Sequence, residues 1–230
     1  MPAALSPAFV ADMEHVLRVD ERALDLAFPV VCFDEGRKEL RGEVRDPLPT
    51  APGCPAREDC EYSRHGAASL LLWCAPLLGL REITVTERRT NQDWAHAMQA
   101  LVDHPLFATA TRIQLVLDNL NTHTRAALYE TFAPQEALRI AEKLEFHYTP
   151  KHGSWLNIAE IELSALGNQC LDRRIPDQET LAREVAAWVR NRNAETVTVD
   201  WQFTTDDARI KLKHLYPVLK PVTNMTNAVA

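Results

Sequence analysis

One apolar strand between two helical segments constrains the fold of this chain more than any other feature. Residues 112–118 have the sequence RIQLVLD, an apolar, strand-forming run that ends in an acid. The segments before and after it, 90–103 and 124–132, both repeat apolar residues at the spacing of a helix. Because a strand that is reached and left through helices enters its sheet by crossovers, this pattern predicts an α/β fold.

Further strand and helix patterns flank this central unit. Before it, residues 28–33 form a buried strand with 39–45 as the return strand of a hairpin, and 68–75 pairs with 81–87. The remaining predicted elements are a strand at 145–148 and helices at 134–144, 155–171, 177–193 and 205–216. Together these elements predict a mixed sheet of about five strands with helices on its faces.

The length and the proline pattern suggest how the chain is divided. The 230 residues suffice for one sizeable domain with a small appendage. We expect a leader segment with helical character at 1–27, the main domain at 28–217 and a disordered tail at 218–230. Four prolines make residues 46–62 a long loop, which we interpret as functional or mobile.

Charge, hydropathy and cysteine usage exclude several classes of protein. No apolar run approaches the roughly 18 residues of a membrane span, and the N-terminus lacks the basic region of a signal peptide, so we expect a cytosolic protein. A net charge of −7 argues against strong autonomous binding of DNA, but it is compatible with an active site of carboxylates. The five cysteines indicate reduced thiols rather than a disulfide framework.

Three acidic residues stand where such a sheet presents side chains to solvent. Asp34 ends the first predicted strand, Asp118 ends the central one, and Glu160 lies in the helix after 145–148. Parallel neighbours would bring Asp34 and Asp118 side by side, where a hard divalent ion such as Mg²⁺ relieves their repulsion. With a third carboxylate for a second ion, such a site can cleave a phosphodiester. Taken singly, each acid fits a turn former, a helix cap or a solvated helix residue better.

The segment before the third acid adds groups that favour phosphate. Lys151, His152 and Gly153 bring a cation, an imidazole and a flexible residue to the start of the predicted helix, where anions bind well. The alternative is a plain loop capped by Ser154, and the sequence does not decide between the two. Asn157 stands three residues before Glu160 and therefore shares its helical face.

These motifs together resemble a known family. VVCFDE (30–35), LVLDNLNTH (115–123) and EFHYTPKHGSWLNIAEIELSAL (145–166) are similar to the DDE transposases of the bacterial IS630 group, relatives of Tc1/mariner. The similarity runs from about residue 8 to residue 217. It implies an RNase H-like fold and a Mg²⁺-dependent transposase or endonuclease that cleaves DNA and transfers the freed strand.

The resemblance also assigns roles to residues. It implies that Asp34, Asp118 and Glu160 are the catalytic triad and the ligands of two Mg²⁺ ions, for which Mn²⁺ can substitute. It suggests residues that orient the site or contact DNA: Asn119, Asn121, His123, Lys151, His152 and Asn157. The 42 positions between Asp118 and Glu160 are more than is usual in the group, and the extra residues are expected in 134–144.

The expected partners follow from a departure at the N-terminus. Members of the group carry helix-turn-helix domains before the catalytic domain, whereas only about 30 residues precede Asp34 here. We therefore interpret the chain as a catalytic half, whether a truncated copy, a second reading frame or a fragment, with uncertain activity on its own. The expected partners are transposon-end and target DNA, a second copy in a homodimer and a separate DNA-binding half, in the cytoplasm of a bacterium at the nucleoid.

Two other hypotheses stay open from the sequence. A remnant with the catalytic fold but no activity could dimerise with a full-length transposase and inhibit it. A zinc module could form from Cys54, Cys60 and His65, although their spacing fits no paired C-x-x-C pattern. Cleavage activity separates the first hypothesis from the transposase, and zinc content tests the second.

Overall fold

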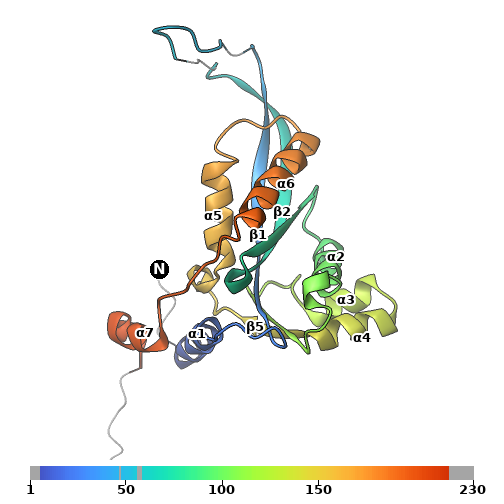
Figure 1. The fold of residues 1–230 in the computed structure, drawn as a ribbon, viewed down its shortest axis with the longest axis vertical. Helices are drawn as coiled ribbons and strands as arrows, with labels where there is room; N and C mark the ends of the chain where they lie inside the picture. Colours follow the sequence, from blue (N-terminus) through green and yellow to red (C-terminus); the bar gives the residue numbers. More distant parts are fainter. Residues whose placement is uncertain (1–5, 47, 56–58, 218–230) are drawn as a thin grey trace, which may run out of the picture.

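A five-stranded mixed sheet forms the centre of the molecule. The computed structural model describes residues 6–46, 48–55 and 59–217. The strand order is β3-β2-β1-β4-β5 (Figure 1), with antiparallel pairing among the first three strands and parallel pairing of β4 with β1 and β5. The strands are β1 (Val30–Glu43), β2 (Tyr62–Ala75), β3 (Leu80–Thr86), β4 (Ile113–Leu117) and β5 (Leu144–Tyr148). The predicted mixed sheet with flanking helices is confirmed.

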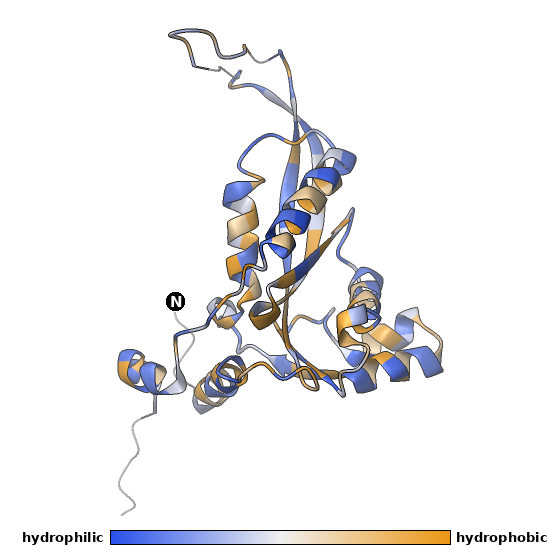
Figure 2. Cartoon of the chain, in the orientation of Figure 1, coloured by the Kyte–Doolittle hydropathy of each residue, from blue (hydrophilic) through white to orange (hydrophobic). Residues whose placement is uncertain are grey.

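Helices cover both faces of this sheet. One face packs against α2 (Asn91–Val102), α3 (Arg125–Thr131) and α4 (Pro134–Lys143), around the buried side chains of Phe33, Trp94 and Leu115. The opposite face packs against the remaining helices: α1 (Pro7–Asp20), α5 (Ala159–Gln169), α6 (Gln178–Ala194) and α7 (Thr205–Lys211). Figure 2 shows apolar residues concentrated where helices meet strands, as expected for alternating strands buried on two sides.

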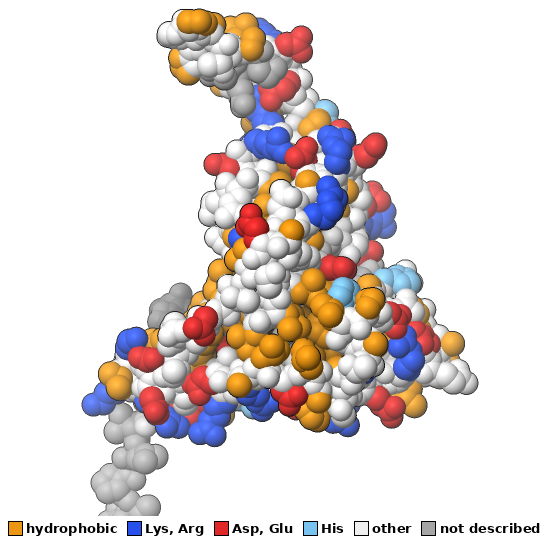
Figure 3. All heavy atoms as spheres, viewed as in Figure 1, with side chains coloured by type: hydrophobic (Ala, Val, Ile, Leu, Met, Phe, Trp, Pro, Cys, Tyr) orange, Lys and Arg blue, Asp and Glu red, His pale blue; other side chains and the backbone are white. Residues whose placement is uncertain are grey.

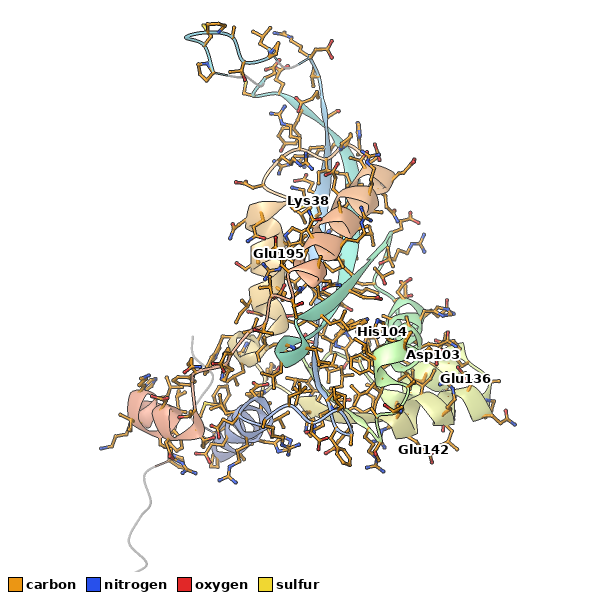
Figure 4. All side chains as sticks on the ribbon, in the orientation of Figure 1. Lys38, Asp103, His104, Glu136, Glu142 and Glu195 are labelled. Atoms are coloured by element: carbon orange, nitrogen blue, oxygen red, sulfur yellow. The ribbon has the colours of Figure 1, made fainter. Side chains whose placement is uncertain are left out.

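Local signals explain where several helices begin and how they are joined. Thr90 and Asp93 form a capping box at α2, and the side chain of Asp177 caps α6. Arg139 of α4 pairs with Glu136 at 2.7 Å and with Asp103 at the end of α2 at 2.9 Å (Figure 4). The contacts of Arg139 thus join two of the helices that cover one side of the sheet. No helix in the described ranges is both long and apolar enough to cross a membrane.

The predicted hairpin of 28–33 and 39–45 is wrong. The structure has one strand, β1, which pairs with β2 along its length, with a register shift between Glu39 and Arg41. The sequence turns polar after residue 33 although the chain does not reverse. Leu40 is still buried against α5 and α6, and only the outer end of β1 leaves the covered part of the sheet. The outer ends of β1 and β2 project beyond α5 and α6 as a two-stranded arm, seen at the top of Figure 1.

The bounds of two predicted helices are also corrected, and one predicted segment lies outside the residues that the structure describes. The helix expected at 155–171 divides into a 3₁₀ turn at Ser154–Leu156 and then α5. The helix expected at 205–216 ends as α7 at Lys211, followed by a 3₁₀ turn. Within the predicted leader, α1 packs on the sheet through Met13, Val16 and Leu17. The predicted tail at 218–230 falls outside the described residues.

Candidate active site

Asp34 and Asp118 meet where the parallel pairing of β1 and β4 ends. That pairing runs in register from Val30 opposite Gln114 to Cys32 opposite Val116. Two residues further along each chain, the same register sets Asp34 level with Asp118. The prediction that Asp34 ends its strand is therefore wrong, since β1 continues past it, but the parallel ladder does end there.

Glu160 approaches from the first turn of α5, which crosses the same face of the sheet. Asn157, only 1% exposed, fixes this approach: its Nδ2 donates to the carbonyl oxygen of Phe33 at 2.8 Å, and its Oδ1 accepts from the amide of Ala159 at 3.1 Å. One amide side chain thus ties the residue before Asp34 to the start of the helix that carries Glu160. This bond to β1 also explains why the predicted helix is interrupted at this point.

The charges of Asp118 and Glu160 act on the carboxyl group of Asp34. Burial raises the pKa of Asp34 to about 6, against the opposing effect of a hydrogen bond from the amide of Glu35. The charges of Asp118 and Glu160 raise it further. A carboxylate that holds its proton this well beside two other acids indicates a site that a divalent cation would stabilise.

His123 is buried beside Asp118 and contacts a second carboxylate. Its Nδ1 lies 2.6 Å from Oδ1 of Asp118, and its Nε2 lies 3.0 Å from Oε1 of Glu35. Burial alone would lower the pKa of His123, but Asp118 and then Glu35 raise it to about 9. The ring therefore carries a positive charge at neutral pH, next to the acid predicted to bind metal.

A pocket of about 410 Å³ opens next to Asp118. It is lined by Asp118, Asn119, Leu120, Thr149, Pro150, Lys151, His152 and Ser154. The amide of Gly153 donates to the carbonyl of Pro150 at 2.8 Å, which closes a turn with His152 at a φ of 67°. This turn exposes Lys151 and His152 at the pocket. A Cβ on Gly153 would lie 2.6 Å from Cγ of Pro150, so the turn needs glycine.

The structure thus brings together most of the predicted site. Asp34, Asp118, Glu160, His123 and Asn157 converge at one end of the sheet, while Asn119, Lys151 and His152 line the adjoining pocket. Asn121 is exposed in the loop after β4 and is not among the residues that line the pocket.

The donor atoms of the three acids are of the type that binds a hard divalent ion, but their spacing fits such an ion less well. Carboxylate oxygens are the ligands that Mg²⁺ prefers. Within the described ranges, however, no three His, Cys, Asp or Glu residues are grouped closely enough to hold a metal ion. The residue types therefore fit such an ion, and the three carboxylates would have to draw together around it.

The zinc hypothesis loses one of its ligands. Both ring nitrogens of His65 have other partners, since Nδ1 lies 2.7 Å from the carbonyl oxygen of Pro176 and Nε2 lies 3.0 Å from Oγ of Ser63. Cys54 and Cys60 are exposed, and the described part of the chain holds no grouping of metal ligands around them.

Comparison with known proteins decides the family. Residues 29–182, two thirds of the chain, match the DDE superfamily endonucleases. This chain belongs to the DDE superfamily endonuclease family. No curated protein is significantly similar to it in sequence.

Solved structures of the Mos1 mariner transposase share the fold of this DDE superfamily endonuclease. The paired-end complex with Mn matches with a TM-score of 0.61 at 16% identity, covering 96% of this chain and 65% of that one. The Mos1 catalytic domain matches with a TM-score of 0.53 at 13% identity, covering 86% of this chain and 96% of that one. The RNase H-like fold is thereby confirmed, and the chain spans less than two thirds of the transposase in the paired-end complex.

One residue of the site escaped the sequence analysis. Glu35 follows Asp34 directly, so it reads from the sequence as part of the turn expected there. Its side chain is only 5% exposed and lies against His123. Successive residues of a strand point to opposite faces, so Glu35 lies on the face opposite Asp34. This alternation could have distinguished the two acids if the strand had been predicted to continue.

Proposed function

We propose that this DDE superfamily endonuclease is the catalytic domain of an IS630-group transposase, which cleaves DNA at transposon ends and joins the freed 3′ end to target DNA. The observation that carries the proposal is the meeting of Asp34, Asp118 and Glu160 at one end of the sheet. The Mos1 structures that share the fold include a paired-end complex with Mn, one with Mg and a strand transfer complex.

The three carboxylates are the proposed ligands for two Mg²⁺ ions, with Mn²⁺ as a substitute. Ions held there supply activation of a water for attack on a phosphodiester and stabilisation of the leaving oxygen. Asn157 keeps the start of α5, and with it Glu160, against β1. Lys151 and His152 are exposed beside the pocket, where they can donate hydrogen bonds to a DNA phosphate. Asn119 and Asn121 are proposed to contact the same DNA strand.

The proposed partners are DNA and a second copy of the chain. A net charge of −7 leaves little general attraction for DNA, so we assign recognition of transposon ends to a separate DNA-binding half. Locally, cations do gather, with acids among them: Figure 3 shows Lys and Arg side chains where the β1–β2 arm meets α6. One recess there is lined by Lys38, Arg41, Arg173 and Arg174 together with Glu39 and Asp172. The proposed location is the nucleoid of a bacterial cytoplasm.

Plasmid nicking in the presence of Mn²⁺ tests the activity. We expect the wild type to nick supercoiled plasmid, and Asp118→Asn and Asp34→Asn each to lower the rate by about 100-fold or more. The matched control is Glu142→Gln, which removes an exposed acid from α4 and leaves the rate unchanged (Figure 4). Equal nicking by the wild type and Asp118→Asn contradicts the assignment of the triad.

The alternative function has an observation of its own. The acids of the described chain are not grouped closely enough for a metal, and His123 already pairs with Asp118. A remnant without activity that dimerises with a full-length transposase and inhibits it fits that arrangement. It predicts no nicking by the wild type, together with a loss of activity when the chain is added to an active, related transposase.

A further inference from the structure

Glu35 lies under the active site and is held in place from two sides. Its Oε1 accepts a hydrogen bond from Nε2 of His123 at 3.0 Å, and its Oε2 lies 3.5 Å from a guanidinium nitrogen of Arg89. The side chain is 5% exposed, on the face of β1 opposite Asp34. Both carboxylate oxygens of Glu35 therefore already have a partner, so Glu35 is not free to bind a metal ion.

His123 has little freedom to move between its two carboxylates. Its ring stacks on Trp94 with centroids 5.8 Å apart and meets the edge of Phe33 at 5.2 Å. Its carbonyl oxygen accepts a hydrogen bond from the hydroxyl of Tyr148 at 2.9 Å. The side chain is fully buried, so water does not compete for either ring nitrogen. What fixes one nitrogen therefore sets the position of the other.

The other nitrogen reaches the predicted metal ligand. Nδ1 of His123 lies 2.6 Å from Oδ1 of Asp118 and 3.3 Å from its carbonyl oxygen. This contact of Nδ1 with Oδ1 leaves the other carboxylate oxygen of Asp118 for a metal ion. The same contact limits rotation of a side chain that stands just past the end of β4 and is 28% exposed.

We propose that Glu35 is a positioning residue that acts through His123 to fix the carboxylate of Asp118, so that Asp118 presents a single oxygen to a divalent cation. This inference rests on the proposed function, because it gives Asp118 the role of a metal ligand. Glu35 touches neither substrate nor ion. Its effect passes through the imidazole, so it disappears when the imidazole is removed.

The first test needs no metal. With ¹⁵N-labelled histidine, we expect two slowly exchanging ring N–H signals for His123 in the wild type, because both N–H groups are buried against carboxylates. Glu35→Ala removes the Nε2 signal, whereas Glu39→Ala, which deletes a partly exposed acid four residues along β1, retains both. Absence of the signals in the wild type, or their persistence in Glu35→Ala, overturns the proposal.

The second test is a double-mutant cycle on the affinity for Mn²⁺, measured by titration calorimetry. Glu35→Ala is expected to weaken binding about tenfold. Glu35→Gln, which keeps an acceptor for Nε2, recovers most of that loss. In a His123→Ala background, Glu35→Ala has no further effect, because the residue that transmits its influence is gone.

The outcomes separate the two proposals. Additive losses in the cycle show that Glu35 acts on the ion by itself, and they overturn only the role given to it here. A wild type that binds no Mn²⁺, like Asp118→Asn, contradicts the metal site of the proposed function. The ring N–H signals decide in either case whether Glu35 holds His123. Thermal unfolding of each variant distinguishes a loss of binding from a loss of the fold.

Discussion

At the scale of single residues, the site depends on side chains that share a strand but serve opposite faces. Asp34 faces α5, and Glu35 faces His123. The meeting of Asp34 and Asp118 could be predicted, since two acids at the ends of parallel strands meet at one edge of the sheet. The support from Glu35 could not, because the sequence does not reveal which of two adjacent acids is buried.

Asp20 makes a prediction at the same scale. It ends α1 with 9% of its surface exposed, and neither carboxylate oxygen has a hydrogen-bond partner among the described residues. Burial, with a smaller effect from Glu21, raises the pKa of Asp20 from 3.8 to about 8. The folded protein therefore keeps a proton that the unfolded chain releases near pH 4, and stability falls as the pH rises from about 4 to 8.

Asp20→Asn removes this dependence. We expect the free energy of unfolding of the variant to exceed that of the wild type by about 1–3 kcal/mol at pH 8. The difference at pH 4 should be much smaller. Urea unfolding at the two pH values measures it. Asp12→Asn, an exposed acid on the same helix, is the control and leaves the profile unchanged. An Asp20→Asn profile parallel to that of the wild type would rule out a buried, protonated Asp20.

At the scale of elements, α5 is anchored by a buried ion network two residues beyond Glu160. Glu162 is 1% exposed, and its oxygens lie 3.0 Å from Nε of Arg81 on β3 and 2.9 Å from Nη2 of Arg192 on α6. Arg81 is equally buried and bonds further to the side chain of Asn193. Strand β3 and helices α5 and α6 are thus joined at one carboxylate.

Glu162→Gln tests this junction. Removal of the charge leaves two guanidinium groups without their shared partner, so we expect a loss of about 3–5 kcal/mol in the free energy of unfolding. Chemical denaturation measures the loss, and Glu195→Gln at the exposed end of α6 is the control (Figure 4). A change below about 1 kcal/mol would show that solvent reaches the network.

The elements also show where sequence patterns are reliable. The helix at 90–103 and the strands at 112–118 and 145–148 were predicted because capping residues and apolar periods mark them. The continuation of β1 was missed because the residues after Phe33 are mostly polar, and polar residues beside Gly36 are equally typical of a turn. The break before α5 depends on the contact of Asn157 with Phe33, which no local pattern encodes.

At the scale of the whole molecule, binding of metal is linked to stability. An ion that binds only when β1, β4 and α5 are assembled stabilises the folded chain as a unit. We expect Mn²⁺ at roughly ten times its Kd to raise the Tm of the wild type by about 3–6 °C. Asp118→Asn should show no such rise in differential scanning calorimetry. An equal rise in both proteins would place the bound ion elsewhere.

The continuity of β1 has a consequence for how this chain can change over generations. Asp34 and the outer arm lie on one strand, so they share a single alternation of faces. Insertion of one residue between Gly36 and Lys38 would turn every later side chain of the arm to the opposite side, unless another bulge absorbed it. The register shift between Glu39 and Arg41 marks the point where such a length change is already accommodated. Length variants among natural homologues should therefore fall at or beyond that shift, and the stretch from Asp34 to Lys38 should keep its length.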